Sequence, residues 1–523
     1  MRIALRPLDL LRPSPDYSNG PMPLRGHYVS LQKRLHLTIA SSLAALVLML
    51  MLFSRSAQVS HLEIKGLRIL DQLWMSTTTA TRADFYEWRT VSHFHPVRQA
   101  TANKDMSELC DAFPKDKLRE IQPILKTGSG LETRLRPHLQ SVSACLGDEL
   151  LIFSDEARDF DAHTIIDALS ALRPGFVRGN SQLESYNARD TSAANDTLLS
   201  SSDSHLRGWQ SDKFKFLPQV SSTWRMRPHK RWYVFYEDDT YIVWDNMIRF
   251  LENFDPDLPW YFGSPSPGAR GLWMANGGPG YVISREAMRR LVREDYDSQG
   301  LYAGSFLSQR WEEEMMRDCC GDSILSLALH QDAQTNLSGM FPMFQPHGLH
   351  SIPLSDEYWC QPLLTMHKTS AEHMLGFRKW EESRRRLHRP LLFADIVDFL
   401  NLTTVHIRSD WTNSDFGGYR APNDGAHVSF QSCDLACRID RDCLQWTYRL
   451  GVCTFVAFLR LGHSTPQGGD YSGPETDDTL RPFHKDKNAW AGWDRDGIKQ
   501  WMSEEGRDCG HVRWEKPSTS RIN

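Results

Sequence analysis

Short apolar runs alternate with helical patterns through the middle of the chain. The runs at residues 121–125, 149–153 and 232–236 have the length and composition of buried strands. Residues 246–251 and 323–329 follow the pattern of short helices. Strands that alternate with helices predict an α/β sandwich with a mainly parallel sheet, in which ligands bind beyond the carboxyl ends of the strands.

One apolar run is much longer than these. Residues 35–54 contain no Asp, Glu, Lys or Arg, and at a rise of ~1.5 Å per residue such a helix spans about 30 Å, the thickness of bilayer hydrocarbon. Basic residues outnumber acidic ones in the preceding segment, so we predict a transmembrane signal anchor with the rest of the chain in the lumen. A cleaved signal peptide is the alternative, although its apolar region is usually only ~7–15 residues long.

The remaining sequence divides by composition. Residues 1–34 are predicted to be a cytosolic tail, and residues 55–105, which have weak periodicity, a stem. Residues 106–404 carry the alternating strand and helix pattern. Gly, Asn, Asp and Ser gather near residues 405–430, so we predict a domain boundary there, followed by a C-terminal module and tail over residues 405–523.

Composition supports a globular protein of several domains. The chain has 523 residues, of which 40% are hydrophobic and 24% charged, so wholesale disorder and a many-span membrane protein are excluded. Its 60 Lys and Arg residues against 65 Asp and Glu residues give a net charge of −5. We therefore expect no nucleic-acid partner, because there is no global basic field.

The cysteines and sequons fit the predicted luminal side. All ten cysteines follow residue 109, and the lumen of the secretory pathway permits disulfides. Three N-glycosylation sequons begin at Asn195, Asn336 and Asn401. Four cysteines cluster in the C-terminal module: Cys433, Cys437, Cys443 and Cys453. Their spacing lacks the C-x₂-C pattern of zinc sites, and four cysteines leave three disulfide pairings open.

Three adjacent carboxylates follow the third predicted strand, in the sequence WYVFYEDDTYI at residues 232–242. Glu237, Asp238 and Asp239 repel one another, so a divalent cation is their natural partner, and oxygen ligands suit Mg²⁺ or Mn²⁺. A solvated acidic turn is the alternative. A cation there could bridge the carboxylates to a nucleotide diphosphate.

This strand resembles the D-x-D strand of fringe-like glycosyltransferases, the glycosyltransferase family 31 group, and is most similar to fungal members. Further segments resemble the family in the expected order: IQPILKTG (121–128), LLIFSD (150–155), GWQSDKFKFLP (208–218), WYFGSP (260–265), NGGPGYVISREAMRRL (276–291), CGDSI (320–324) and WCQPLLTMHK (359–368). The resemblance covers residues 115–370. It implies a GT-A-like, Rossmann-type fold in a type II Golgi membrane enzyme. It also implies inverting transfer of a galactose- or GlcNAc-type sugar from a UDP-sugar to a glycan or glycoprotein hydroxyl.

The resemblance also implies a role for each matching residue. Asp239, Glu237 and His367 would bind the metal, and a carboxylate–imidazole set favours Mn²⁺ over Mg²⁺. Glu237 departs from the Asp of animal fringe proteins and adds one methylene to the side chain that would contact the metal or the ribose. The donor nucleotide and sugar would be bound by Lys126, Thr127, Asp155, Glu237, Asp238, Gly277 and Gly278. For Lys126 and His367 the alternative is an ordinary surface residue.

Asp322 would be the general base that takes the proton of the acceptor hydroxyl. Its alternative role is the N-cap of the helix that follows, and both roles are compatible. The preceding residues are Cys319-Cys320-Gly321, where animal relatives more often have an acid. Asp318 is therefore the second candidate for the base.

The C-terminal module resembles a PAN/apple module over residues 405–490. The resemblance implies disulfides Cys433–Cys453 and Cys437–Cys443 and a role in binding protein or carbohydrate; a structural cap is the alternative. Its tryptophans are candidates for sugar stacking or, more often, for core packing.

A second function remains open at this point. A membrane-anchored lectin-like protein could retain a degenerate transferase fold, which the unusual Glu237 and the Cys319-Cys320-Gly321 run would explain. A metal-dependent phosphodiesterase would need more His and Asp ligands than the sequence provides in one place.

Overall fold

A computed structural model gives the structure of part of the chain. It describes residues 85–86, 88, 91–96, 109–184, 186–187, 211–293, 299, 307–465 and 489–522. The predicted cytosolic tail, signal anchor and most of the stem, together with the Asn195 sequon, lie outside the described residues. Within the described ranges, every helix is too short or too polar to cross a membrane.

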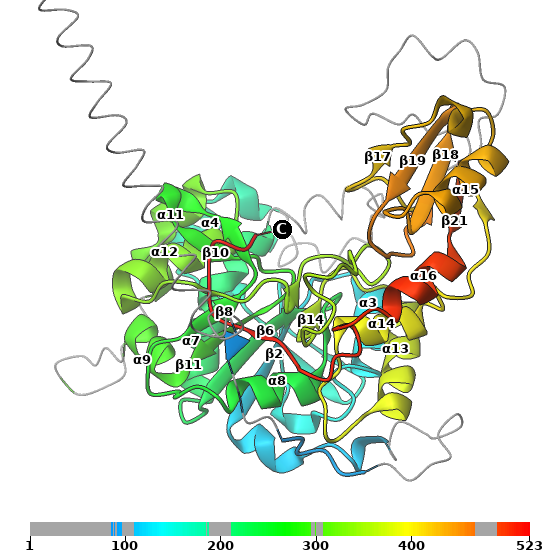
Figure 1. Ribbon diagram of the computed structural model, residues 1–523. Coiled ribbons are helices and arrows are strands. Elements are labelled where there is room, and N and C mark those ends of the chain that lie inside the picture. Colours follow the sequence, from blue (N-terminus) through cyan, green and yellow to red (C-terminus); the bar gives the residue numbers. More distant parts are fainter. Residues whose placement is uncertain are drawn as a thin grey trace, which may run out of the picture. The chain divides into compact units, whose positions relative to one another are not determined.

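The central feature is an eight-stranded sheet (Figure 1). Its strands, in spatial order, are β12 (Ser338–Gly339), β8 (Tyr261–Gly263), β11 (Tyr281–Ser284), β6 (Trp232–Glu237), β2 (Ile121–Lys126), β3 (Leu151–Ser154), β5 (His163–Asp167) and β4 (Arg158–Phe160). Strands β6, β2, β3 and β5 are parallel to their neighbours in that series. β11 runs antiparallel to β6, β8 runs antiparallel to β11, and β4 runs antiparallel to β5. The sheet is therefore mixed, with the predicted parallel order at its centre.

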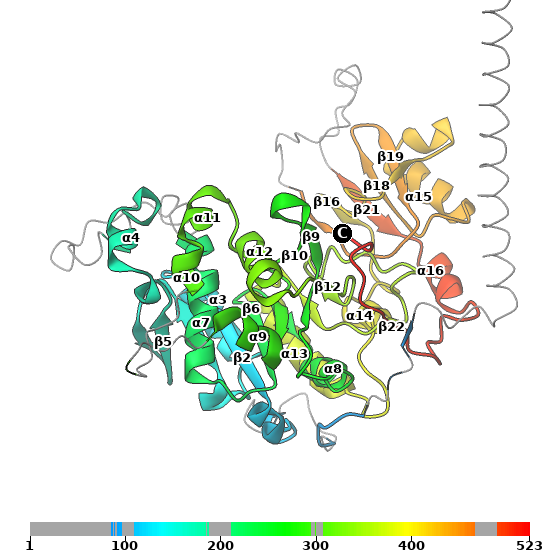
Figure 2. The ribbon, with the colours of Figure 1, turned by 90° about the vertical axis from the view of Figure 1, so that its left-hand side faces the viewer.

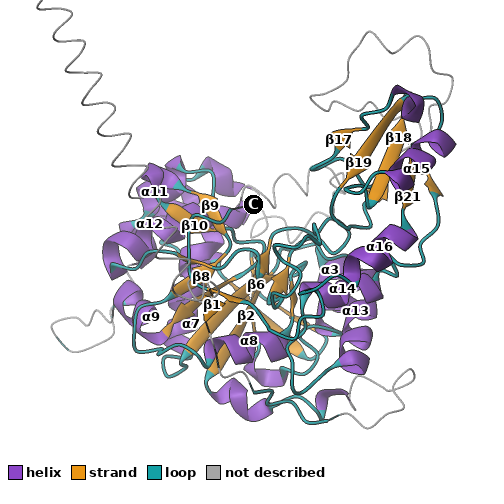
Figure 3. Cartoon of the chain, viewed as in Figure 1, coloured by secondary structure: helices purple, strands orange, loops and turns teal. Residues whose placement is uncertain are grey.

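Both faces of this sheet are buried, because successive side chains of a strand point to opposite faces. Trp232, Val234 and Tyr236 of β6 enter one hydrophobic core, whereas Tyr233 and Phe235 enter the other. The second core is covered by α7 (Phe216–Met226), α9 (Arg285–Val292) and α12 (Gly321–Ala333). The first is covered by α3 (Glu132–Leu139), α8 (Trp244–Leu251), α13 (Ala371–Arg384) and α14 (Phe393–Phe399) (Figures 2 and 3). The predicted α/β sandwich is thus present.

A small three-stranded sheet lies next to the acidic turn. It consists of β13 (Phe344–Gln345), β14 (Thr365–Met366) and β7 (Tyr241–Ile242), in that order. In the antiparallel pair, Met366 lies opposite Tyr241 and Thr365 opposite Ile242. This register brings the residue after β14 close to the residues before β7, which are the acidic ones.

The C-terminal module contains a five-stranded sheet and one helix packed on it. Its strands are β15 (Arg408–Ser409), β21 (Trp490–Trp493), β18 (Gln445–Arg449), β19 (Val452–Val456) and β17 (Tyr419–Arg420), and the helix is α15 (Phe430–Ile439). Disulfides join Cys433 to Cys453 and Cys437 to Cys443, so the implied pairing is confirmed. Trp446 and Trp493 are buried, as expected for core packing.

The chain returns to the larger sheet after this module. Helix α16 (Arg495–Met502) follows β21, and Cys509 then forms a disulfide with Cys360. Strand β22 (Trp514–Glu515) pairs antiparallel with β1 (Phe85–Tyr86). The Ser518 amide donates to the carbonyl of Gly339 in β12, at 2.7 Å. The last residues therefore belong structurally with the sandwich.

We predict that the Cys360–Cys509 disulfide contributes more stability than the short-range pair Cys437–Cys443. The first closes 149 residues and the second 6, for which chain entropy gives at most about 5 and about 2 kcal/mol respectively. Urea unfolding of the Cys360→Ala/Cys509→Ala protein should show the larger loss, with Cys437→Ala/Cys443→Ala as the matched control. Equal losses would show that loop closure is not the source of stability.

Candidate active site

The acidic residues form a tight turn at the carboxyl end of β6. Glu237 is the last residue of the strand, and the Thr240 amide donates to its carbonyl at 3.0 Å. The Thr240 hydroxyl accepts from the Glu237 amide at 3.1 Å and donates to the carbonyl of Gly278 at 2.6 Å. One buried threonine therefore ties the acidic turn to the Gly-rich turn.

The three predicted metal ligands come together. The His367 Nε2 lies 3.4 Å from the Asp239 Oδ1, and ligand atoms of Glu237, Asp239 and His367 all lie within 4.8 Å of one another. The Asp239 Oδ1 is buried and accepts no hydrogen bond from the described residues. Two carboxylates and an imidazole suit a divalent transition-metal ion, so this set could hold Mn²⁺.

Gly278 is required for this arrangement. A Cβ at residue 278 would lie 2.1 Å from a carbon of the His367 ring, which no side-chain rotation of a residue at 278 can relieve. The backbone of the Gly-rich turn therefore packs directly on the imidazole and fixes its position.

Burial and like charge dominate the electrostatics of the turn. Burial, with the neighbouring Asp239 and Glu237 charges, raises the pKa of Asp238 to about 7, although the Thr127 hydroxyl opposes this by donating to it at 2.5 Å. Burial would also raise the pKa of Asp239. Instead, His367 and the Arg134 guanidinium hold that pKa below its usual range.

The predicted nucleotide-binding residues lie in a buried ion network at the ends of β2 and β3. The Lys126 ammonium lies 2.5 Å from Asp212 and 3.0 Å from Glu237, and these charges raise its pKa despite burial. Lys126 also lies over the Phe216 ring, 4.1 Å from its centroid. The alternative that Lys126 is a surface lysine is wrong, because its side chain is 6% exposed.

A second buried lysine supports this network. The Lys215 ammonium donates to the carbonyl of Thr127 at 3.0 Å and lies 3.3 Å from Asp155. Asp155 also accepts from the amide and hydroxyl of Ser129. Sequence reasoning assigned no role to Lys215 or to Asp212, although both lie in the segment GWQSDKFKFLP that carried the resemblance.

Asp322 contacts the same Gly-rich turn. It is the second residue of α12, and its Oδ2 accepts from the Gly277 amide at 3.0 Å. Burial raises the pKa of Asp322, against the Gly277 and Ser323 amides and the Lys126 charge. The N-cap residue is Cys320, so the predicted N-cap role of Asp322 is wrong.

Asp318, the second candidate for the base, has a different orientation. Its carboxylate accepts from the Cys320 amide at 3.1 Å and from the Ser323 hydroxyl at 2.8 Å. It thus serves the start of α12, and Asp322 is the carboxylate that contacts the Gly-rich turn.

An open cavity of about 580 Å³ lies beside the acidic turn and His367. Its lining includes Asp238, Asp239 and His367 and the segment from Lys368 to Ala371 that leads into α13. Arg134 of α3 also lines it, with its Nη1 3.5 Å from Asp239. Sequence reasoning missed Arg134, which lies in an ordinary amphipathic helix.

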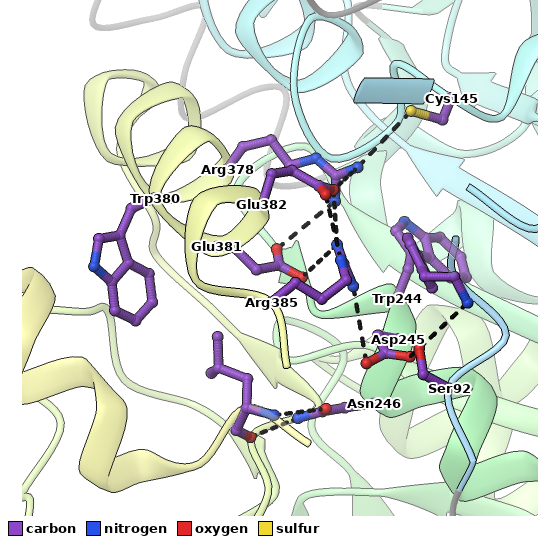
Figure 4. A network of polar contacts seen from close by, with 12 residues as sticks. Ser92, Cys145, Trp244, Asp245, Asn246, Arg378, Trp380, Glu381, Glu382 and Arg385 are labelled. Carbon is purple, nitrogen blue, oxygen red and sulfur yellow. Dashed lines mark hydrogen bonds and ion pairs between the residues drawn. The ribbon is translucent and has the colours of Figure 1, made fainter. Parts of the chain in front are cut away.

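A buried ion network on α13 and its C-cap reaches α8 through one pair (Figure 4). Arg378 and Arg385 each lie 2.7 Å from Glu382, and Arg385 also lies 3.9 Å from Asp245. The Tyr241 hydroxyl, in β7 after the acidic turn, donates to Glu381. Helix α8, which follows the acidic turn, and helix α13, which follows His367, are therefore joined by charge as well as by packing.

The α/β sandwich and the residues at its strand ends are consistent with a GT-A-like fold. A family model described as Fringe-like matches residues 190–337. This range contains the acidic turn, the Gly-rich turn and Asp322. The chain therefore carries a fringe-like segment over residues 190–337, and the fringe-like resemblance seen in the sequence is confirmed there.

Two curated relatives match short stretches of the chain. A glycoprotein-N-acetylgalactosamine 3-beta-galactosyltransferase 1 of Xenopus laevis is 44% identical over 62 residues, 12% of this chain and 17% of the relative. The Fringe glycosyltransferase of Drosophila melanogaster is 26% identical over 79 residues, 12% of this chain and 19% of the relative. The chain thus spans less than a fifth of the length of each of these relatives.

We predict that Gly278→Ala weakens Mn²⁺ binding by at least about tenfold, because the new methyl group displaces the His367 ring from Asp239. Titration calorimetry with MnCl₂ measures this. Gly175→Ala is the matched control, since a Cβ there meets no atom within 4 Å. Equal Mn²⁺ affinity of the Gly278→Ala and unsubstituted proteins would contradict the assignment of His367 as a ligand.

Proposed function

We propose that this protein is an inverting, metal-dependent glycosyltransferase. It transfers a galactose- or GlcNAc-type sugar from a UDP-sugar to a hydroxyl of a glycan or glycoprotein. One observation carries the proposal: the Gly277–Gly278 turn contacts both Asp322 and His367 of the carboxylate–imidazole set. A proton acceptor and a cation-binding set are thus held by one turn, and single-displacement sugar transfer needs both close to the reacting atoms. The fringe-like match over residues 190–337, which include the acidic turn, the Gly-rich turn and Asp322, supports it.

The residues act on the acceptor and on the leaving group separately. Asp322 takes the proton of the acceptor hydroxyl as the oxygen attacks C1 of the donor sugar, and the bond from C1 to the UDP oxygen breaks. Asp239, Glu237 and His367 hold Mn²⁺, with Mg²⁺ as the alternative; when bound, the ion supplies positive charge for the diphosphate leaving group. Lys126 offsets the charges of Glu237 and Asp212 beside these residues.

The proposal includes a location in the secretory pathway. The long apolar run at residues 35–54 supports a single-pass type II anchor in the Golgi membrane with a luminal catalytic domain. All ten cysteines form disulfides, which agrees with an oxidising compartment. The C-terminal module, which resembles PAN/apple domains, would bind a protein or carbohydrate part of the acceptor.

The first test is a panel of UDP-sugars with Mn²⁺. We expect release of UDP with one of them, and Asp239→Ala should lower turnover at least about 100-fold, because the leaving-group charge is no longer stabilised. Asp496→Ala, whose side chain is 92% exposed, is the surface control. Unchanged turnover in Asp239→Ala would disprove the metal assignment. A lectin-like binder would instead hold glycans in calorimetry and release no sugar from any donor.

The second test separates the two candidate bases. Asp322→Asn should bind UDP with unchanged affinity and lose at least about 100-fold in kcat, because the amide cannot accept the proton. Asp318→Asn is the matched control and should keep kcat within about tenfold, since Asp318 only serves the start of α12. The reverse result would transfer the role of base to Asp318.

A further inference from the structure

The start of α12 carries a disulfide between two adjacent residues, Cys319 and Cys320. Among the ten cysteines, Cys319 is exposed and Cys320 is half-buried, whereas the other eight are buried. The bond closes a small ring that includes the peptide unit just before the helix. The backbone dihedrals that set the direction of the first turn are therefore restrained covalently.

Noncovalent contacts hold the same segment on both sides of the ring. Lys213 donates to the carbonyl of Asp318 at 2.7 Å, and the carboxylate of Asp318 accepts from the amide of Cys320. The Ala269 amide donates to the Ser323 hydroxyl at 3.0 Å, and that hydroxyl donates to Asp318. These contacts orient the first turn of α12, and the disulfide ring adds a covalent restraint on the same backbone.

A displacement of this turn would reach Asp322 directly. Gly321 packs on the Phe216 ring, where a Cβ would lie only 2.2 Å from a ring carbon. The same ring lies beneath Lys126 and against Gly277. Asp322 follows Gly321 and must keep its oxygen 3.0 Å from the Gly277 amide. The first turn of α12 thus lies between the Phe216 ring and the Gly-rich turn. A small shift of this turn would therefore change the position of the Asp322 carboxylate.

We propose that the Cys319–Cys320 disulfide is a positioning element for Asp322, and that a dithiol opens it reversibly and lowers transfer. This proposal rests on the function proposed above, in which Asp322 is the base. It assigns a role to Cys319-Cys320-Gly321, a run of residues where animal relatives more often have an acid.

The redox step is an ordinary thiol–disulfide exchange. A thiolate of the dithiol attacks the exposed sulfur of Cys319, and the Cys320 thiolate leaves and takes up a proton. The second thiolate of the reductant then attacks the mixed disulfide, which releases Cys319 as a thiolate that is protonated in turn. Two electrons pass to the protein, and the reductant becomes a cyclic disulfide.

The first experiment replaces both cysteines in the full chain. Cys319→Ser/Cys320→Ser should lower kcat about tenfold or more, with unchanged affinity for UDP, because a small misplacement of the base is costly while the donor site is intact. Cys437→Ser/Cys443→Ser is the control for loss of a short-range disulfide and should keep kcat. Full activity of the Cys319→Ser/Cys320→Ser protein would overturn the proposal.

A double-mutant cycle with Asp322→Asn distinguishes positioning from general destabilisation. If the disulfide acts through Asp322, its loss should change the residual activity of Asp322→Asn less than about twofold, since the base is already absent. The same fold loss in both backgrounds would show a merely structural role and overturn the proposal.

A redox titration with dithiothreitol tests the unsubstituted protein without any change that could impair folding. Activity should fall in parallel with alkylation of Cys319 and Cys320, measured by mass spectrometry, and return on reoxidation before alkylation. The Cys319→Ser/Cys320→Ser protein should not respond. Full activity of protein with both residues alkylated would overturn the proposal. Absence of transfer from every UDP-sugar by the untreated protein would instead overturn the proposed function.

Discussion

The accumulation of negative charge at the end of β6 is the constraint on which the site depends. Three carboxylates in sequence are placed by a fully buried strand where water can stabilise them only in part. The chain compensates with Lys126 on the Glu237 side and with Arg134 and His367 on the Asp239 side. Asp238, between them, accepts from the Thr127 hydroxyl and lies 3.9 Å from the exposed Arg134 guanidinium, but burial outweighs both and raises its pKa. The compensation is partial, so a bound cation would complete it.

The Gly-rich turn connects the acidic turn with the cation-binding His367 and with the candidate base Asp322. Its carbonyl at Gly278 accepts from Thr240 of the acidic turn, its backbone supports His367, and its Gly277 amide donates to Asp322. Segments more than a hundred residues apart in sequence thus meet through one turn without a bulky side chain. Because one partner in each of these contacts is a backbone group of the turn, the backbone of the turn sets the relative positions of the base and the cation-binding residues.

The strands and the acidic cluster could be predicted because their signals are local. Residues 121–125 and 232–236 are apolar runs with the expected strand length, and β2 and β6 extend them by one residue each. The pairing of these strands is not local, and the antiparallel β11 beside β6 was not foreseen. Lys215, Asp212 and Arg134 were missed because their neighbours across the sheet decide their burial and charge partners, which no spacing reveals. The Cys319–Cys320 bond was missed because adjacent cysteines usually pair with distant ones.

After the C-terminal module the chain returns to the sandwich, which the composition of the sequence did not suggest. A boundary near residues 405–430 implies a module appended to a finished domain. Strand β22 nevertheless pairs with β1, Cys509 is bonded to Cys360, and Ser518 donates to Gly339 at the edge strand β12. The module is therefore inserted between parts of one fold, and both of its ends are fixed to the sandwich. Cys360 begins a segment that leads through β14 to His367. The C-terminal residues thus stabilise, through the Cys360–Cys509 disulfide, the segment that supplies the His367 imidazole.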